Sequence, residues 1–153
     1  MIRWYAAPDI AETIAEIQFR AVREGPSQYT EAQRAAWIAA PHSADALGAR
    51  LKDARAVLFR RGDEDVGCMT LSPGGYIEMA FILPAHQGTG VFRALYTALE
   101  AQAVHAREPR LWTFASLMAQ APFQAMGFRV INHETVERAG EMLRRAEMEK
   151  VLE

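Results

Sequence analysis

Apolar residues recur at helical spacing in the first third of the chain. Ile14, Ile17 and Val22 lie on one face of a helix that is predicted to begin near Ile10, and the Gly-Pro pair at residues 25–26 ends it. A short run at residues 2–5, "IRWY", precedes this helix and has the character of a β-strand. The chain is therefore expected to open with a strand and then turn into an amphipathic helix.

Two shorter helices are predicted after this break. Thr30 is a candidate N-cap for the stretch "EAQRAAWIAA", which ends before "PHS" at residues 41–43. Ser43 is a candidate N-cap for a further helix that runs through Leu51.

The pattern changes to β-rich runs after Ala54. Residues 55–61, 65–72 and 76–83 are predicted to be strands, because each run is rich in β-branched and other apolar residues. The turn-forming segments "GDED" and "SPGG" separate them. This spacing predicts two hairpin turns and a meander.

Helices and strands alternate in the last third of the chain. We expect a helix from Val91 to Arg107, a strand at 110–116, a helix from 117 that ends at Gly127 and paired strands at 129–138 and 141–151. A helix is the alternative for residues 141–150, since "EMLRRAEMEK" is rich in good helix formers. Taken together, the elements predict a mixed α+β or α/β sheet protein.

The composition is that of one ordinary globular domain. The chain has 153 residues, of which 50% are hydrophobic, and residues 1–153 are expected to form a single domain. Its 17 Lys and Arg nearly balance its 19 Asp and Glu, so no basic field favours nucleic acid. No run approaches the ~18 apolar residues of a membrane span. We therefore expect neither a nucleic-acid nor a membrane partner.

Cysteine and histidine usage narrows the chemistry further. The single cysteine, Cys68, excludes an intrachain disulfide and a CxxC motif, and is most simply a small, partly buried hydrophobe. The first ten residues lack the apolar core of a signal peptide, so the reducing cytoplasm is the expected compartment. The four histidines are scattered, without i, i+4 or HxH grouping, so no metal site is predicted.

The segment "HQGTGVF", residues 86–92, carries the most specific chemistry. Two glycines lie in the segment that connects a predicted strand to a predicted helix. Glycines at this place suit either a phosphate-binding backbone loop or a plain tight turn. A dinucleotide-binding GxGxxG motif would need a third small residue where this chain has Arg93. A P-loop would need a Gly-Lys-Ser/Thr triplet, which is absent.

The flanks of this segment carry a family resemblance. "FILPAHQGTGVFRALYTALE" resembles the central acetyl-CoA motif of the GCN5-related N-acetyltransferase (GNAT) family, hydrophobic-x-Pro-x-x-Gln/Arg-Gly-x-Gly-x-Gly/Ala. Gln87, Gly88, Thr89 and Gly90 occupy the loop positions, whereas Phe92 stands where a small residue is usual.

A second signature supports the resemblance. "SLMAQAPFQAMGF" is similar to Asn-x-x-Ala-x-x-Phe-Tyr-x-x-x-Gly-Phe: Ala119, Gly127 and Phe128 match, while Ser116 stands at the Asn position. The resemblance extends from about Ile2 to Leu152.

The resemblance implies the GNAT acyl-CoA N-acyltransferase fold. This is an α/β (mixed α+β) fold with a central mixed, mostly antiparallel sheet of about six to seven strands, flanked by helices, in which the strand at 76–83 splays from the strand at 110–115. The cofactor implied is acetyl-CoA, with its pantetheine arm along the splayed strand and its pyrophosphate on the loop. The implied cofactor-binding residues are Phe81, Ile82, Leu83, Gln87, Gly88, Thr89, Gly90, Val91, Phe92 and Phe123. His86 and Arg93 could meet its phosphates, although a solvated histidine and a surface arginine are the alternatives.

The implied reaction is direct attack of an amine on the acetyl thioester. Glu78 is the candidate general base, and a salt-bridged strand glutamate is its alternative. At the family's Phe-Tyr pair this chain has Pro122 and Phe123, and phenylalanine cannot donate a proton. Three alternatives follow: the thiolate leaves unassisted or through water, another hydroxyl serves, or acetyl-CoA binds without turnover. The candidate hydroxyls are Ser116, Tyr29, Tyr76 and Thr113.

The acceptor is expected to be a small-molecule or peptide amine. Tyr29, Trp37 and Tyr76 are the candidate substrate-binding residues, with helix-on-sheet packing as the alternative for Trp37. A homodimer through the last strands is a further expectation. Two other functions remain open: a non-catalytic acyl-CoA-binding or regulatory module on the same fold, and an unrelated α/β protein whose glycines form only a turn.

Overall fold

The computed structural model describes residues 1–152, and its N-terminal third is mainly helical. The predicted first strand and the three predicted helices are confirmed, and the second helix is shorter than the sequence suggested because it ends at Trp37. A 3-10 turn, η1, lies between the strand and the first helix. The elements are β1 (Ile2–Ala6), η1 (Ala7–Ile10), α1 (Ala11–Arg23), α2 (Glu31–Trp37) and α3 (Ala44–Arg50).

The predicted N-caps hold α2 and α3 in place. Thr30 and Gln33 form a reciprocal capping box, in which the Thr30 side chain accepts from the Gln33 amide and the Gln33 side chain accepts from the Thr30 amide. The Ser43 side chain accepts from the Ala46 amide at the start of α3. Such caps stabilise a helix by about 0.5–2 kcal/mol, which matters most for helices as short as these.

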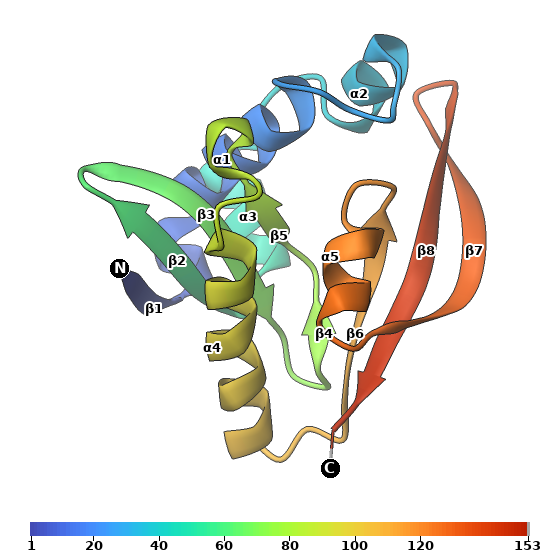
Figure 1. The fold of residues 1–153 in the computed structure, drawn as a ribbon. Helices are drawn as coiled ribbons and strands as arrows, with labels where there is room; N and C mark the ends of the chain where they lie inside the picture. Colours follow the sequence, from blue (N-terminus) through green and yellow to red (C-terminus); the bar gives the residue numbers. More distant parts are fainter. Residues whose placement is uncertain (153) are drawn as a thin grey trace.

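The first half of the fold is a four-stranded sheet in the order β1-β2-β3-β5. All of its neighbours are antiparallel, and β2 and β3 form the predicted hairpin around Gly62 and Asp63. In Figure 1, α4 crosses in front of this sheet, and α1 and α3 lie behind it. The elements not yet given are β2 (Arg55–Arg61), β3 (Glu64–Leu71), β5 (Ala80–Ile82) and α4 (Val91–His105).

The second half is a four-stranded sheet in the order β4-β6-β8-β7. β4 and β6 are parallel, whereas β8 is antiparallel to both of its neighbours. Residues 141–150 therefore form a strand, and the helical alternative for them is wrong. The short helix α5 (Gln120–Ala125) packs on β6. The strands are β4 (Tyr76–Ile77), β6 (Arg110–Ser116), β7 (Arg129–Arg138) and β8 (Glu141–Val151).

One predicted strand, at residues 76–83, joins the two sheets. It is divided at Glu78 and Met79, so that β4 pairs with β6 in one sheet and β5 pairs with β3 in the other. If β4 and β5 count as this one interrupted strand, the fold has seven strands, mostly antiparallel, which agrees with the six to seven expected. Within residues 1–152, β5 has no strand partner on the side that faces β6. β5 and β6 are therefore the splayed pair of strands that the resemblance implies. Figure 1 shows the two halves diverging on either side of this segment.

The "SPGG" turn before β4 brings the two sheets together. Gly75 has a φ of +82°, and a side chain there would overlap the carbonyl oxygen of Arg110. Its own carbonyl accepts from the Trp112 amide at 3.0 Å, and the Gly74 amide donates to Glu108 Oε2 at 2.9 Å. Glycine is therefore required where β4 begins beside β6.

The buried core is continuous across both halves. It contains residues of α1, both sheets and α4, together with Phe123 of α5. Cys68 lies in this core with none of its surface exposed, and its burial raises the pKa of the thiol to about 12. Cys68 is thus a small hydrophobe, as the sequence suggested, but it is fully rather than partly buried.

Two surface features bear on partners. None of the helices within residues 1–152 is both long and apolar enough to cross a membrane. The edge strand β7 and its neighbour β8 expose Ile131, Met142 and Val151 to 44–61%. These residues are where two chains would pair if the protein dimerises, which stays a prediction.

Candidate functional site

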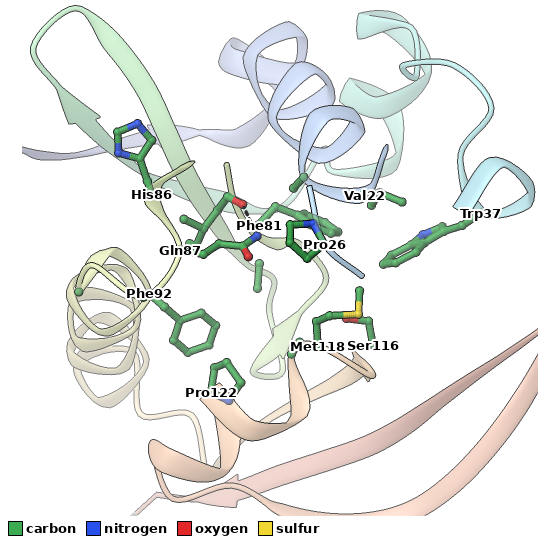
Figure 2. A pocket seen from close by; sticks show the side chains of 16 residues that line it. Val22, Pro26, Trp37, Phe81, His86, Gln87, Phe92, Ser116, Met118 and Pro122 are labelled. Atoms are coloured by element: carbon green, nitrogen blue, oxygen red, sulfur yellow. Dashed lines mark hydrogen bonds between the residues drawn. The ribbon is translucent and has the colours of Figure 1, made fainter. Parts of the chain in front are cut away.

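Two cavities open beside the splayed strand. The first, here called the loop cavity, has a volume of about 290 Å³ and lies between β5, the start of α4 and α5, as Figure 2 shows. The second, the Glu78 cavity, has a volume of about 380 Å³ and lies on the β4 side. The two share five lining residues: Trp37, Ala80, Phe81, Ser116 and Ala119. A ligand can therefore reach from one to the other along β5.

The glycine loop adopts a backbone that favours glycine. Gly88 has a φ of +72° and Gly90 a φ of +91°, and Gly90 is the N-cap of α4. A methyl group added at either position would meet nothing within 4 Å, so the space over the loop is open. Left-handed backbone, rather than crowding by the rest of the chain, explains the two glycines.

Backbone N–H groups are the polar feature of this loop. Within residues 1–152, the amides of Gly88, Thr89, Gly90, Val91 and Phe92 have no hydrogen-bond partner. The α4 dipole adds partial positive charge at the same place, which suits an anion such as pyrophosphate. The sixth amide of the expected set, that of Gln87, instead donates to the Pro84 carbonyl at 3.3 Å.

Side chains brace the loop from its outer side. Thr89 Oγ1 donates to the His86 carbonyl at 2.5 Å and accepts from Arg61 at 2.9 Å. Arg61 also donates to the Thr89 carbonyl at 3.2 Å and lies 3.2 Å from His86 Nδ1, while His86 Nε2 lies 3.3 Å from Glu64. Sequence reasoning missed Arg61, because nothing in its own strand links it to a loop 25 residues later.

The outward edge of β5 offers main-chain groups to the loop cavity. The Met79 carbonyl and the Leu83 amide bond to β3, and Phe81 is in register with Cys68. Because strand residues alternate, the main-chain groups of Ala80 and Ile82 face away from β3. The Gln87 side chain donates to the Ile82 carbonyl at 3.1 Å and so ties the loop to this edge.

The predicted cofactor residues therefore fall into two sets. The Leu83 and Val91 side chains are buried and line neither cavity, and the Thr89 side chain is turned toward Arg61. The others line the loop cavity, the Glu78 cavity or both: Phe81, Ile82, Gln87, Gly88, Gly90, Phe92 and Phe123. Ala80, which sequence reasoning missed, joins them because it sits between Met79 and Phe81 on the outward edge.

Glu78 lies at the interruption between β4 and β5. Its side chain is 12% exposed, lines the Glu78 cavity and pairs with Arg50 at the end of α3. Tyr76 lines the same cavity and stacks on Trp112 with ring centroids 4.3 Å apart. Burial, followed by the nearby Glu78 carboxylate, raises the pKa of Tyr76. The Glu78 carboxylate and the Tyr76 hydroxyl, which stays protonated, therefore line the same cavity.

The four candidate hydroxyls differ in what they already bind. Tyr29 donates to the Arg144 carbonyl at 2.5 Å and accepts from the Leu117 amide at 3.0 Å. Thr113 donates to the Ile77 carbonyl at 2.8 Å. For Ser116 and Tyr76 the described part of the chain supplies no partner, and both line the Glu78 cavity. Ser116 and Tyr76 therefore remain available to a ligand.

Phe123 occupies an aromatic cluster rather than an open position. It is 1% exposed, with its ring edge-on to Phe92 at 5.0 Å and tilted against Phe128 at 4.9 Å. Phe92, at the position where the motif usually has a small residue, is thereby packed against the residue that replaces the usual tyrosine. The two departures from the family pattern lie in contact with each other.

Trp37 and Tyr29 form an aromatic wall. Their rings meet edge-on at 5.8 Å, and Trp37 is tilted against Phe81 at 6.1 Å. Trp37 lines both cavities, whereas Tyr29 lines only a smaller side cavity of about 80 Å³. Trp37 is therefore positioned between the two cavities, and Tyr29 mainly joins β8 to the segment after β6.

The histidines and acidic residues do not gather as metal ligands. No group of three or more His, Cys, Asp or Glu side chains within residues 1–152 could hold a metal ion.

Comparisons with known proteins agree with this geometry. A family model described as an acetyltransferase (GNAT) domain matches residues 26–152. A GCN5-related N-acetyltransferase from Rhodopseudomonas palustris, also described as a class II aminotransferase, is 27% identical with a TM-score of 0.88, over 99% of this chain and 95% of that one. Among curated protein sequences, none is significantly similar to this chain.

Two more distant structures share the fold and were solved with the cofactor. The PaiA N-acetyltransferase of Thermoplasma acidophilum, in complex with coenzyme A, is 14% identical with a TM-score of 0.73 and is covered to 99% in both chains. A phosphinothricin acetyltransferase of Sinorhizobium meliloti, in complex with acetyl-CoA, is 20% identical with a TM-score of 0.72, over 99% of this chain and 88% of that one.

Proposed function

Because this chain belongs to the GNAT family of acetyltransferases, we propose that it transfers an acetyl group from acetyl-CoA to the primary amine of a small molecule or peptide. One observation carries the proposal. Five consecutive amides, from Gly88 to Phe92, lack partners in residues 1–152, on a loop whose glycines line a cavity. Such a run of free N–H groups at a helix N-terminus is suited to a pyrophosphate.

The residues present fit the rest of acetyl-CoA. The outward main-chain groups of Ala80 and Ile82 would pair with the amides of the pantetheine arm, as an added strand would. The apolar lining of the loop cavity, which includes Phe81, Phe92 and Met118, would cover its methylene groups. Bound acetyl-CoA supplies the acetyl group as a thioester, and the amine displaces CoA from it.

Glu78 is proposed to take the proton from the attacking amine. An ammonium has no lone pair, so a nearby carboxylate must accept its proton directly or through water. Glu78 stands in the cavity that joins the loop cavity at Phe81 and Ser116, and its pairing with Arg50 orients it. An outward N–H of β5 would stabilise the negative charge that develops on the acetyl oxygen.

Ser116 is proposed to protonate the departing thiolate. It lies on the wall shared by both cavities, and within residues 1–152 its hydroxyl has no other partner. Tyr76 is the second choice, because it lines only the Glu78 cavity and not the wall that both cavities share. A thiolate is a good leaving group, so its departure needs little help from an acid. An enzyme with Phe123 in place of the usual tyrosine can therefore still release CoA, with Ser116 as the proton donor.

A non-catalytic acyl-CoA-binding module is the second candidate. The specific observation in its favour is Phe123, which is buried between Phe92 and Phe128 and has no hydroxyl. Steady release of free thiol from acetyl-CoA in the presence of a panel of amines would exclude this candidate.

The reducing cytoplasm remains our proposed compartment for this protein. We also propose that residues 1–153 form a single domain.

Isothermal titration with acetyl-CoA tests the proposal. We expect micromolar affinity for acetyl-CoA and little for S-acetyl-pantetheine, which has the same arm but lacks the pyrophosphate. Absence of binding at millimolar acetyl-CoA would overturn the proposal, and the glycines would then form only a turn. Binding of both ligands with equal affinity would exclude the loop as the pyrophosphate site.

A further inference from the structure

Two arginines of the β7–β8 hairpin line the Glu78 cavity. Arg138 near the end of β7 and Arg145 on β8 line both the Glu78 cavity and the side cavity of about 80 Å³. Within residues 1–152, no carboxylate lines the side cavity, and Glu78 is the only one that lines the Glu78 cavity. Because Glu78 pairs with Arg50 and Arg145 pairs with Glu134, the positive charge left without an ion pair on this wall is that of Arg138.

These two arginines retain donors for a ligand. Arg145 donates through Nε to Glu134 at 2.5 Å, and its guanidinium lies 4.4 Å from the centroid of the Phe114 ring, which holds it in place. Arg138 donates only to the Glu137 carbonyl, at 3.0 Å, and has no ion-pair partner within residues 1–152. The planar fork of N–H donors on an arginine suits a carboxylate or a phosphoryl group, which it can bind through two hydrogen bonds.

A buried acceptor without a partner lies on another wall of the same cavity. Gln18 on α1 lines the Glu78 cavity and is 5% exposed, and within residues 1–152 its buried Oε1 has no hydrogen-bond partner. A buried acceptor left unpaired costs about 1–3 kcal/mol, so such a group usually has a partner that is not part of the chain. An amine offers that N–H, and Glu78 lines the same cavity.

The cavity therefore offers an acceptor for an N–H group on α1 and cationic donors on the β7–β8 hairpin, and its lining also includes the aromatic rings of Trp37, Tyr76 and Phe114. We propose that the acceptor is an amine that also carries an anionic group, a carboxylate or a phosphonate or phosphate, with an apolar segment between them. Gln18 and Glu78 receive the amine, and Arg138 and Arg145 hold the anion. This inference rests on the proposed function, since it names the substrate class of the same site.

The experiment compares matched acids and amides. Protein saturated with CoA is titrated with L-leucine, L-methionine and L-phenylalanine, with their primary amides, and with the corresponding 1-aminoalkylphosphonates. We expect at least one carboxylate or phosphonate to bind about tenfold more tightly than its amide, the worth of one charge-assisted bidentate contact. The carboxylate and phosphonate arms separate the two sources of the anion.

Variants assign the preference to the arginines. Arg138→Gln is the primary test, because its side chain bonds only to a backbone carbonyl and its loss should not unfold the hairpin. We expect it to reduce the preference for acid over amide at least fivefold. Arg144→Gln is the matched control: it neighbours Arg145 on β8, but strand alternation puts it on the other face, where it lines no cavity.

Several results would overturn the inference. These are equal affinity for acids and amides, no binding of any acid, or a preference that Arg138→Gln leaves unchanged. The titration with acetyl-CoA is measured on the same preparation. Acetyl-CoA binding without an acid preference refutes this inference and leaves the proposed function intact, whereas loss of acetyl-CoA binding refutes the proposed function itself.

Discussion

The loop cavity and the Glu78 cavity share a wall but are built in different ways. Around the first, the polar groups are mostly main-chain N–H and C=O groups from one continuous stretch, residues 80–92. Around the second, they are side chains contributed by α1, α3, the β4–β5 interruption and the β7–β8 hairpin. One cavity is thus encoded by neighbours in sequence, and the other only by neighbours in space.

This difference explains how a common cofactor and a variable acceptor coexist. A site made of backbone groups depends on φ, ψ and helix position, so many side chains are compatible with it. A site made of side chains from these four segments changes whenever one of the side chains is substituted. The fold therefore supports the cofactor assignment, while the acceptor has to be argued from named residues.

The largest effect is expected from Gly90→Val. A branched side chain at a φ of +91° costs about 1–2 kcal/mol in strain and projects into the space proposed for pyrophosphate. We expect the Kd for acetyl-CoA to rise about 100-fold or more in isothermal titration. The control is Gly140→Val in the β7–β8 turn, where φ is +85° and a side chain also meets nothing within 4 Å. Similar losses of affinity in both variants would indicate general destabilisation rather than a lost site.

Glu78→Gln should separate the two cavities. The amide cannot accept a proton, so we expect kcat to fall about 100-fold, the lower end of general-base contributions, with the Kd for acetyl-CoA unchanged. Steady-state thiol release and isothermal titration give the two numbers. Glu137→Gln, at an exposed position on β7, is the control that should alter neither. Equal loss of turnover and affinity would contradict the role assigned to Glu78.

Ser116→Ala tests the shared wall with a smaller effect. We expect kcat to fall about tenfold, less than for a typical general acid, because a thiolate is already a good leaving group. Ser116→Thr keeps a hydroxyl at this position and should restore most of the activity. An unchanged kcat in the alanine variant would transfer the role to Tyr76 or to water.

The smallest effect is expected from Arg61→Gln. This variant loses the hydrogen bonds from Arg61 to Thr89 that brace the loop. It keeps every backbone amide that is proposed to bind the cofactor. We expect the Kd for acetyl-CoA to rise three- to fivefold, equivalent to about 1 kcal/mol. The neighbouring Arg60→Gln, which removes a contact to Asp65 instead, should leave the Kd unchanged. A loss as large as that of Gly90→Val would mean that side chains, not backbone, determine the loop site.

Much of the fold was predictable because its signals are local. The capping box at Thr30 and Gln33, the turns at "GDED" and "SPGG" and the spacing of apolar residues in α1 each depend on a few consecutive residues. Prediction was weaker at ends and interruptions. The helix of α2 stops four residues before the proline that was expected to close it, and the break at Glu78 and Met79 has no glycine or proline to announce it.

The candidate site shows the same division. Gln18 could have been found from sequence, because it is a polar residue at i+4 from Ile14 and i−4 from Val22 on an apolar helix face. No comparable signal marks Arg61, Arg138 or Arg145, whose importance depends on which loop or cavity they face. The hydroxyls of Tyr29 and Thr113 looked as free in sequence as that of Ser116, yet both are already bonded.

By itself, the sequence determined the glycine loop at the start of α4 and the order of helices and strands. It also indicated the family to which the chain belongs. These follow from backbone preferences and apolar periodicity, which act over a few residues. Only the tertiary structure decided which hydroxyls remain free, that Phe92 and Phe123 pack together, and that a chain of net charge −2 places arginines around one cavity. Those features depend on long-range packing, since the side chains that meet there are separated by as many as 127 residues, from Gln18 to Arg145.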